Sequence, residues 1–153
     1  MRAAMLCPVV VMAAAVLVTG CSASQGTKSG GQSTSNRPTG VPGSAVEVVT
    51  DLQLNDDRTV SWVDAKFEQS KIGDEIVVPI SGGTHRSAEF APDGLLLTPE
   101  GCKPPFGDIR VDADGLGGVP CTWADFAKQD LYAPKIWFGQ DGRVSKIASR
   151  YHP

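Results

Sequence analysis

Apolar and polar positions alternate over short stretches of residues 46–153, and turn-forming residues separate these stretches. Alternation with a period of two places successive side chains on opposite faces of a strand, whereas a helix repeats its apolar positions every three or four residues. In one such stretch Val60 and Trp62 would share one face, and Val63 and Ala65 the other. The spacing predicts an all-β domain, a single antiparallel β-sandwich or barrel of about eight short strands.

Two pairs of these stretches are expected to form β-hairpins. Residues 46–54 and 59–68 flank a polar four-residue turn, and residues 131–138 and 143–151 flank the turn Gln140-Asp141-Gly142. Asp and Gly at such positions supply the backbone angles that tight turns require. The remaining expected elements are a strand at 75–80, a hairpin of 86–90 with 95–98 across Pro92-Asp93-Gly94, strands at 108–113 and 119–123, and a helical turn at 124–129.

The first 20 residues have a different pattern. Arg2 is their only charge, and an unbroken run of apolar and small residues follows from Ala3 to Val18. A membrane-spanning helix needs about 20 apolar residues, so this shorter run at the N-terminus predicts the hydrophobic segment of a signal peptide, residues 1–20.

The sequence Val18-Thr19-Gly20-Cys21 that ends this segment resembles the lipobox of bacterial lipoproteins, with Val in place of the commoner Leu. The resemblance implies that Cys21 is diacylated and becomes the mature N-terminus. It also implies a membrane partner through the diacylglycerol on Cys21, and a location at the extracytoplasmic face of the cell membrane. The alternative is an ordinary secretory signal, or a plain apolar N-terminus with an incidental cysteine. Two acyl chains suffice for stable anchoring.

Residues 21–45 are expected to form a flexible tether between the lipid and the domain. Of the 24 residues 22–45, 16 are Ser, Thr, Gly or Pro, and Val41 is the only large aliphatic residue. Such a segment has too few apolar side chains to form a core. As a Gly/Ser-type coil it would have a root-mean-square reach of roughly 25–30 Å.

Charge and cysteine usage narrow the interpretation of the domain, residues 46–153. It holds 17 acidic and 11 basic side chains, and therefore a net charge of −6 without a basic cluster, which argues against a nucleic-acid partner. Cys7 belongs to the signal segment and Cys21 to the lipobox, which leaves Cys102 and Cys121 as a predicted disulfide. A zinc site would need further thiols or nearby histidines.

The sequence contains no recognisable catalytic, metal or cofactor motif. Asp108, Asp112 and Asp114 precede Gly115, but their spacing fails the EF-hand pattern, so a solvated turn and no metal are expected. The only histidines, His85 and His152, sit in no known catalytic pattern, and no cofactor is expected.

Aromatic residues are the main candidates for ligand contacts, because their faces stack on ligands while their polar edges form hydrogen bonds. Trp62 is expected in the core, and Tyr132 and Tyr151 are possible lining residues of a groove. Phe106 follows two prolines at a rigid loop tip. The possible binding residues are Phe106, Trp123, Trp137 and His85.

The leading functional hypothesis is an exported, lipid-anchored cell-envelope lipoprotein that acts as a non-catalytic binding or interaction module. Its partner would be an envelope protein, a glycan or a small ligand. The alternative is an envelope enzyme or enzyme inhibitor, which would require residues such as Asp64, Glu89, His85 or Asp108 to converge in one pocket.

A third hypothesis comes from the last predicted hairpin. Residues 131–151, with Asp141-Gly142-Arg143 between two strands, are similar to the closing hairpin of the nuclear transport factor 2-like superfamily. That resemblance implies a cone-shaped fold that often binds small ligands, although that family opens with helices and no helical segment is expected before the strands here.

Overall fold

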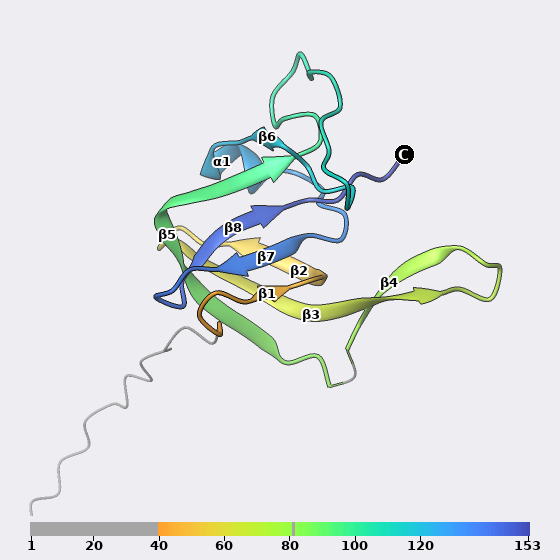
Figure 1. Cartoon of the computed structure of the whole chain (residues 1–153), viewed down its shortest axis with the longest axis horizontal. Coiled ribbons are helices and arrows are strands. Elements are labelled where there is room, and N and C mark those ends of the chain that lie inside the picture. The colour runs from red at the N-terminus through yellow and green to blue at the C-terminus, as the bar shows by residue number, and fades with distance from the viewer. Residues whose placement is uncertain (1–39, 81) are drawn as a thin grey trace, which may run out of the picture. The chain divides into compact units, whose positions relative to one another are not determined.

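The computed structural model describes residues 40–80 and 82–153 (Figure 1). The predicted signal peptide, Cys21 and the tether up to residue 39 lie outside the described residues. No helix within the described part has the length and apolar character needed to cross a membrane.

Strands dominate the described residues, and the all-β prediction is confirmed. A single four-residue helix accompanies them in this part of the chain. The elements are β1 (Ala45–Val46), β2 (Val49–Leu54), β3 (Thr59–Gln69), β4 (Glu75–Pro79), β5 (His85–Thr98), β6 (Val119–Pro120), α1 (Trp123–Phe126), β7 (Lys135–Phe138) and β8 (Val144–Ala148).

The strands form one curled sheet in the order β1-β7-β8-β5-β3-β2, with β4 beside β3 and β6 beside β5. Both major hairpins predicted from the turns are present, because β2 pairs with β3 and β7 pairs with β8, each antiparallel. The expectation of a purely antiparallel sheet is wrong at one place: β5 and β8 run parallel, so the sheet is mixed.

The predicted hairpin of 86–90 with 95–98 is also wrong, because both segments belong to the single strand β5. The first half of β5 pairs with β3, and the second half pairs with β8 and β6. Gly94 does not reverse the chain: a Cβ there would lie 2.6 Å from the Phe90 ring, so glycine permits this ring to pack on the strand. A register shift between Phe90 and Leu95 marks the place where β5 changes neighbours.

The strand predicted at 108–113 is a loop with one isolated bridge, from Val111 to Gly117. Asp112 explains the difference, because its carboxylate accepts hydrogen bonds from the backbone N–H groups of Asp114 and Leu116, each at 2.9 Å. An Asp side chain that bonds its own downstream backbone favours a turn over a strand.

Two apolar clusters lie on opposite faces of β3. Val60 and Trp62 are fully buried in the main cluster, and Ala65 and Phe67 belong to a smaller one. The Trp62 indole N–H donates to Asp64 at 2.9 Å, which satisfies its polar edge at the margin of the core. The buried residues of the main cluster are Val49, Val60, Trp62, Ala88, Phe90, Leu96, Phe126, Ile136, Phe138, Val144 and Ile147.

The segment that leads into the domain lies along β7. Ala45 and Val46 pair with Trp137 and Ile136, and the Gly43 N–H donates to the carbonyl of Gly139 at 3.3 Å. Residues 40–45, which were expected to belong to the tether, therefore already contact the sheet.

Adjacent glycines provide a matched test of packing. At Gly117 a Cβ would lie 2.2 Å from the backbone of Thr98, whereas at Gly118 the nearest atom would be 3.6 Å away. We expect Gly117→Ala to lower the free energy of unfolding by about 2 kcal/mol or more, since backbone cannot move aside cheaply. Gly118→Ala should change it by less than about 0.5 kcal/mol. Denaturant unfolding measures both, and equal effects would contradict the packing described here.

Candidate functional site

A disulfide between Cys102 and Cys121 holds the loop that follows β5 against the entry to α1. Two polar contacts fix the same loop: Lys103 forms an ion pair with Asp125 at 2.9 Å, and the Gln129 amide donates to the carbonyl of Cys102 at 3.4 Å. The predicted disulfide is therefore present. The loop that carries Phe106 is connected to α1 and its flanking residues by this bond, by the ion pair and by the hydrogen bond.

The helix itself begins with a side-chain cap. Thr122 is the N-cap residue, and its hydroxyl accepts a hydrogen bond from the Asp125 N–H at 3.3 Å and donates one to the Asp125 carboxylate. Phe126 is the buried residue of this helix and packs into the main core. The Thr122 cap and the buried Phe126 side chain together position the segment that follows α1. That segment forms one wall of a cavity.

This cavity lies where β5, β8 and the segment before β7 meet, and we call it the C-terminal cavity. Its volume is about 240 Å³. It is lined by Thr98, Pro99, Glu100, Gly101, Phe106, Gln129, Asp130, Leu131, Tyr132, Ser149, Arg150, Tyr151 and His152.

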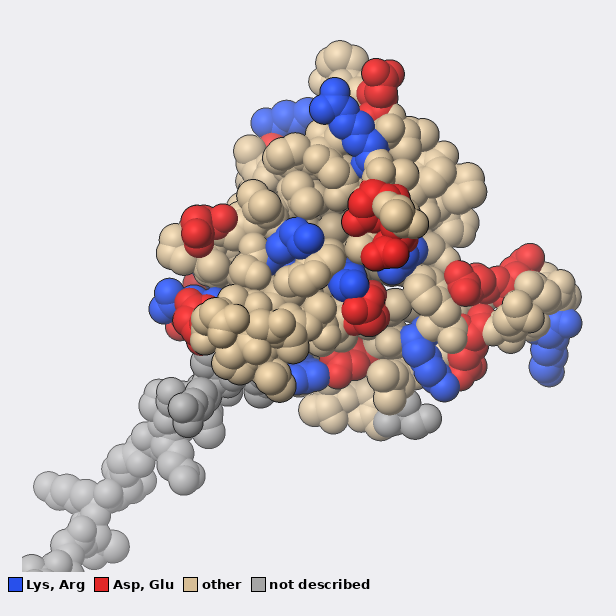
Figure 2. All heavy atoms as spheres, viewed as in Figure 1, with Lys and Arg blue, Asp and Glu red and all other residues tan. Residues whose placement is uncertain are grey.

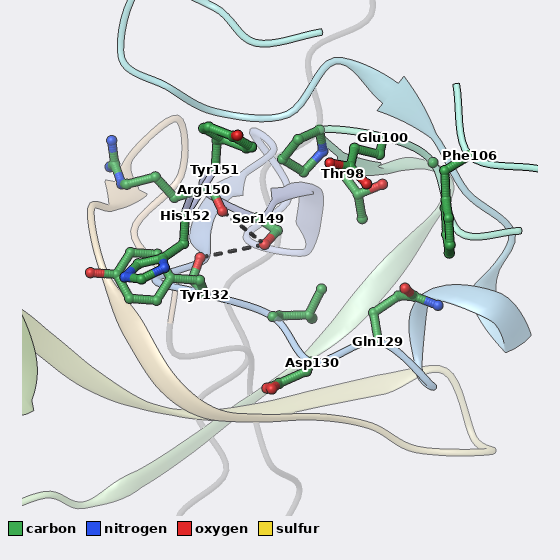
Figure 3. Close-up of a pocket in the computed structure, with 13 residues that line it drawn as sticks. Thr98, Glu100, Phe106, Gln129, Asp130, Tyr132, Ser149, Arg150, Tyr151 and His152 are labelled. Atoms are coloured by element: carbon green, nitrogen blue, oxygen red, sulfur yellow. Dashed lines mark hydrogen bonds between the residues drawn. The ribbon is translucent and has the colours of Figure 1, made fainter. Parts of the chain in front are cut away.

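Aromatic rings stand on two sides of the C-terminal cavity (Figure 3). Tyr132 and His152 lie together on one side, with their ring centroids 4.2 Å apart in an edge-to-face arrangement, and Phe106 lies on the other. Phe106 is 55% exposed, so its ring is accessible to a ligand that enters the cavity.

Backbone bonds fix the chain that carries these rings. The Arg150 N–H donates to the carbonyl of Tyr132 at 2.9 Å, and the buried Ser149 hydroxyl lies 3.4 Å from the same carbonyl. The Tyr151 N–H donates to Gly115 at 2.9 Å. Residues 149–151 are therefore tied to two separate segments, which brings His152 beside Tyr132.

The polar lining carries both signs of charge. Arg150 is a lining residue whose guanidinium turns away from the cavity (Figure 3). It donates to the carbonyl of Asp114 and lies 5.3 Å from the centre of the Phe67 ring, and its Nε is buried without a hydrogen-bond partner among the described residues. Glu100 and Asp130 contribute carboxylates. Acidic and basic side chains are also interspersed over the face of the domain shown in Figure 2.

The four predicted binding residues do not come together. Phe106 lines the C-terminal cavity, whereas Trp137 lines a different depression. Trp123 packs on Phe90, with ring centroids 5.1 Å apart, beneath the Arg58 guanidinium. His85 is exposed at the start of β5, where it pairs with β3 and lines none of the cavities described here.

The Trp137 depression has a volume of about 300 Å³ and lies on the outer face of β5, β7 and β8. Lys146 lies 3.6 Å and Lys135 5.2 Å from the centre of the Trp137 ring. Lys135 is also paired with Glu47 at 2.6 Å. The Trp137 indole face is thus occupied by cations of the protein itself.

The residues that an enzyme site was expected to require are dispersed. Asp64 forms an ion pair with Arg86 at 2.6 Å on the face of β3 that carries the main core, and His85 pairs opposite Val63, whose side chain points to the other face. Glu89 is paired with an arginine of the β7–β8 turn. No group of three or more His, Cys, Asp or Glu side chains in the described residues is arranged to hold a metal ion.

Several lining residues of the C-terminal cavity were not singled out from the sequence. Glu100 and Asp130 follow β5 and α1 in ordinary polar segments, and Arg150 lies just past the last strand. The run Arg150-Tyr151-His152 was a usable signal, because it places three polar or aromatic side chains shortly after the final predicted strand.

No family model matches this chain, and no curated protein or solved structure is significantly similar to it. The resemblance of residues 131–151 to a nuclear transport factor 2-like hairpin therefore stays a prediction.

The cap of α1 generates a prediction about pH. The Thr122 hydroxyl, followed by Lys103, lowers the pKa of Asp125 below its ordinary value. A carboxyl group with a lowered pKa stabilises the fold above that ordinary value, and the contribution disappears as the pH falls through the folded-state pKa. We expect Thr122→Val to raise the pKa of Asp125 in an NMR titration, whereas Thr122→Ser should preserve it. The pKa of Asp57, which is lowered by hydrogen bonds from Thr59, should not respond to either variant. An unchanged pKa of Asp125 in Thr122→Val would refute the assignment.

Proposed function

We propose that this chain is an exported, lipid-anchored lipoprotein of the cell envelope, and that its folded part is a non-catalytic binding module. The C-terminal cavity is the proposed ligand site, and it carries the proposal because it combines accessible aromatic rings with convergent polar groups. The membrane is the second partner, through a diacylglycerol on Cys21.

The support for export comes from two parts of the chain. The apolar segment and the sequence Val18-Thr19-Gly20-Cys21 have the order of a lipoprotein signal. The bond between Cys102 and Cys121 is a feature that persists in oxidising compartments outside the cytosol. Both observations favour the extracytoplasmic face.

The chemistry of the cavity favours a small polar ligand with a flat, partly apolar face, such as one saccharide unit of a glycan. A volume of about 240 Å³ is below the range of roughly 300–1,000 Å³ that is common for sites of drug-sized ligands. Aromatic faces stack on sugar rings. The carboxylates of Glu100 and Asp130 and the amide of Gln129 accept hydrogen bonds from hydroxyl groups.

Acylation of Cys21 is tested by metabolic labelling with a fatty-acid probe. The native chain should incorporate the label and partition with membranes. Cys21→Ser should lose the label and either remain uncleaved or enter the soluble fraction, because the acylated thiol is absent. Cys7→Ser is the matched control and should be labelled like the native chain. A native chain without label would refute lipid anchoring.

Ligand binding is tested by saturation-transfer NMR of the detergent-solubilised protein with a neutral hexose and an N-acetylated hexosamine. We expect His152→Ala to weaken binding by about two- to tenfold, since an aromatic contact contributes about 0.5–1.5 kcal/mol. Lys128→Ala, an exposed change outside the cavity, should leave binding unchanged. No signal from either sugar, or equal binding by both variants, would contradict the proposed ligand class.

A further inference from the structure

The β3–β4 hairpin projects from the rest of the domain (Figure 1), and β4 pairs with β3 alone. Within the described residues, the opposite edge of β4 therefore has no strand beside it. Four of the six residues 75–80 are β-branched, as is typical of a strand: Ile76, Val77, Val78 and Ile80.

The register of the hairpin identifies the backbone groups at this open edge. The Ile80 N–H donates to Asp64 at 2.9 Å, and the Ser70 N–H donates to Asp74 at 2.7 Å. Hydrogen-bonded pairs alternate along an antiparallel ladder, so every second residue of β4 turns its backbone toward β3. The backbone groups that point outward belong to Glu75, Val77 and Pro79.

Proline has no N–H, so the outward donors of β4 are those of Glu75 and Val77. The outward acceptors are the carbonyls of these two residues and of Pro79. Val77 is the centre of this set, with one outward residue on each side.

The side chains beside this edge are apolar and accessible. Ile76 is 42% exposed and Ile80 is 47% exposed, and Val78, between them on the same face, is partly buried. Native proteins usually protect an open edge with charges, prolines or bulges. Strand β2 has such protection, because its register shifts between Thr50 and Gln53. In strand β4 the charge of Glu75 and the ring of Pro79 lie at the two ends, and the residues between them, Ile76–Val78, carry no charge and no proline.

We propose that β4 is a homodimer interface, in which β4 of a second copy pairs with it antiparallel about a two-fold axis at Val77. In this register each Val77 N–H donates to the carbonyl of Val77 in the other copy, and each Glu75 N–H donates to the carbonyl of Pro79 in the other copy. Every outward donor of β4 is then satisfied, and the missing donor of Pro79 faces Glu75 at the two ends. This self-complementary order argues for a second copy as the occupant, since two-fold interfaces present the same surface twice.

The same register brings the exposed apolar side chains together. Ile76 lies opposite Val78 of the other copy, in a pair without hydrogen bonds, where Cβ atoms approach most closely. No carboxylate faces another carboxylate, because Glu75 lies opposite Pro79. The dimer thus sets the apolar stripes of the two β4 strands side by side and places like charges apart.

Sedimentation equilibrium of the full chain in density-matched detergent tests the dimer. Val77→Pro and Glu75→Pro each remove an N–H that points away from β3, and Val77→Thr and Glu75→Gln are controls that keep the N–H. We expect the native chain and the controls to dimerise, and both proline variants to dissociate at least tenfold more readily. A native chain that sediments as a monomer, or proline variants that associate like the native chain, would overturn the proposal.

Disulfide trapping tests the register independently of any loss of stability. Ile76→Cys and Val78→Cys copies, mixed and oxidised, should form a covalent dimer that contains one copy of each. Either variant alone should form much less, because its cysteine faces an isoleucine or a valine. This pairing would be excluded if each variant alone formed as much covalent dimer as the mixture. It would also be excluded if the cysteines formed disulfides only with a different protein. Neither experiment depends on the ligand or on acylation.

Discussion

The domain depends on the way one strand, β5, changes neighbours along its length. Its first half continues the antiparallel sheet from β3, and its second half pairs in parallel with β8. The ring of Phe90 packs where the neighbours change, over the position of Gly94, which has no side chain to displace it. Without this continuous strand, the β2–β3 hairpin and the β7–β8 hairpin would not belong to one sheet around one core.

The parallel pairing also determines where the C-terminal cavity lies. Parallel strands end at the same edge of a sheet, so the residues after β5 and those after β8 emerge side by side. Strand β7 runs antiparallel to β8, so the start of β7 lies beside the end of β8. Tyr132, which precedes β7, therefore lies at the same edge of the sheet. The disulfide and the contacts of α1 then hold Phe106 opposite Tyr132 and His152. One pairing thus brings together aromatic and charged residues from three distant parts of the chain.

The accuracy of prediction from sequence followed the range of the interactions involved. Both major hairpins were predicted because their turns and alternating strands are local signals, and the disulfide because only two cysteines remained for the domain. The turn expected at Asp93-Gly94 failed, since glycine there serves close packing and not chain reversal. The strand expected at 108–113 failed because the Asp112 carboxylate competes for backbone N–H groups. Of the four proposed binding residues, only Phe106 lies in the C-terminal cavity, because its lining depends on pairing across the sheet.

The sequence by itself determined the all-β class, the two hairpins, the burial of Trp62 and the pairing of Cys102 with Cys121. Each follows from alternation, turn chemistry or residue counts, which act over short separations or by elimination. The tertiary structure alone decided the parallel contact of β5 with β8, the lining of the C-terminal cavity and the open edge of β4. These features depend on which strands become neighbours, and that choice is made by the burial of the whole core, which no short stretch of sequence encodes.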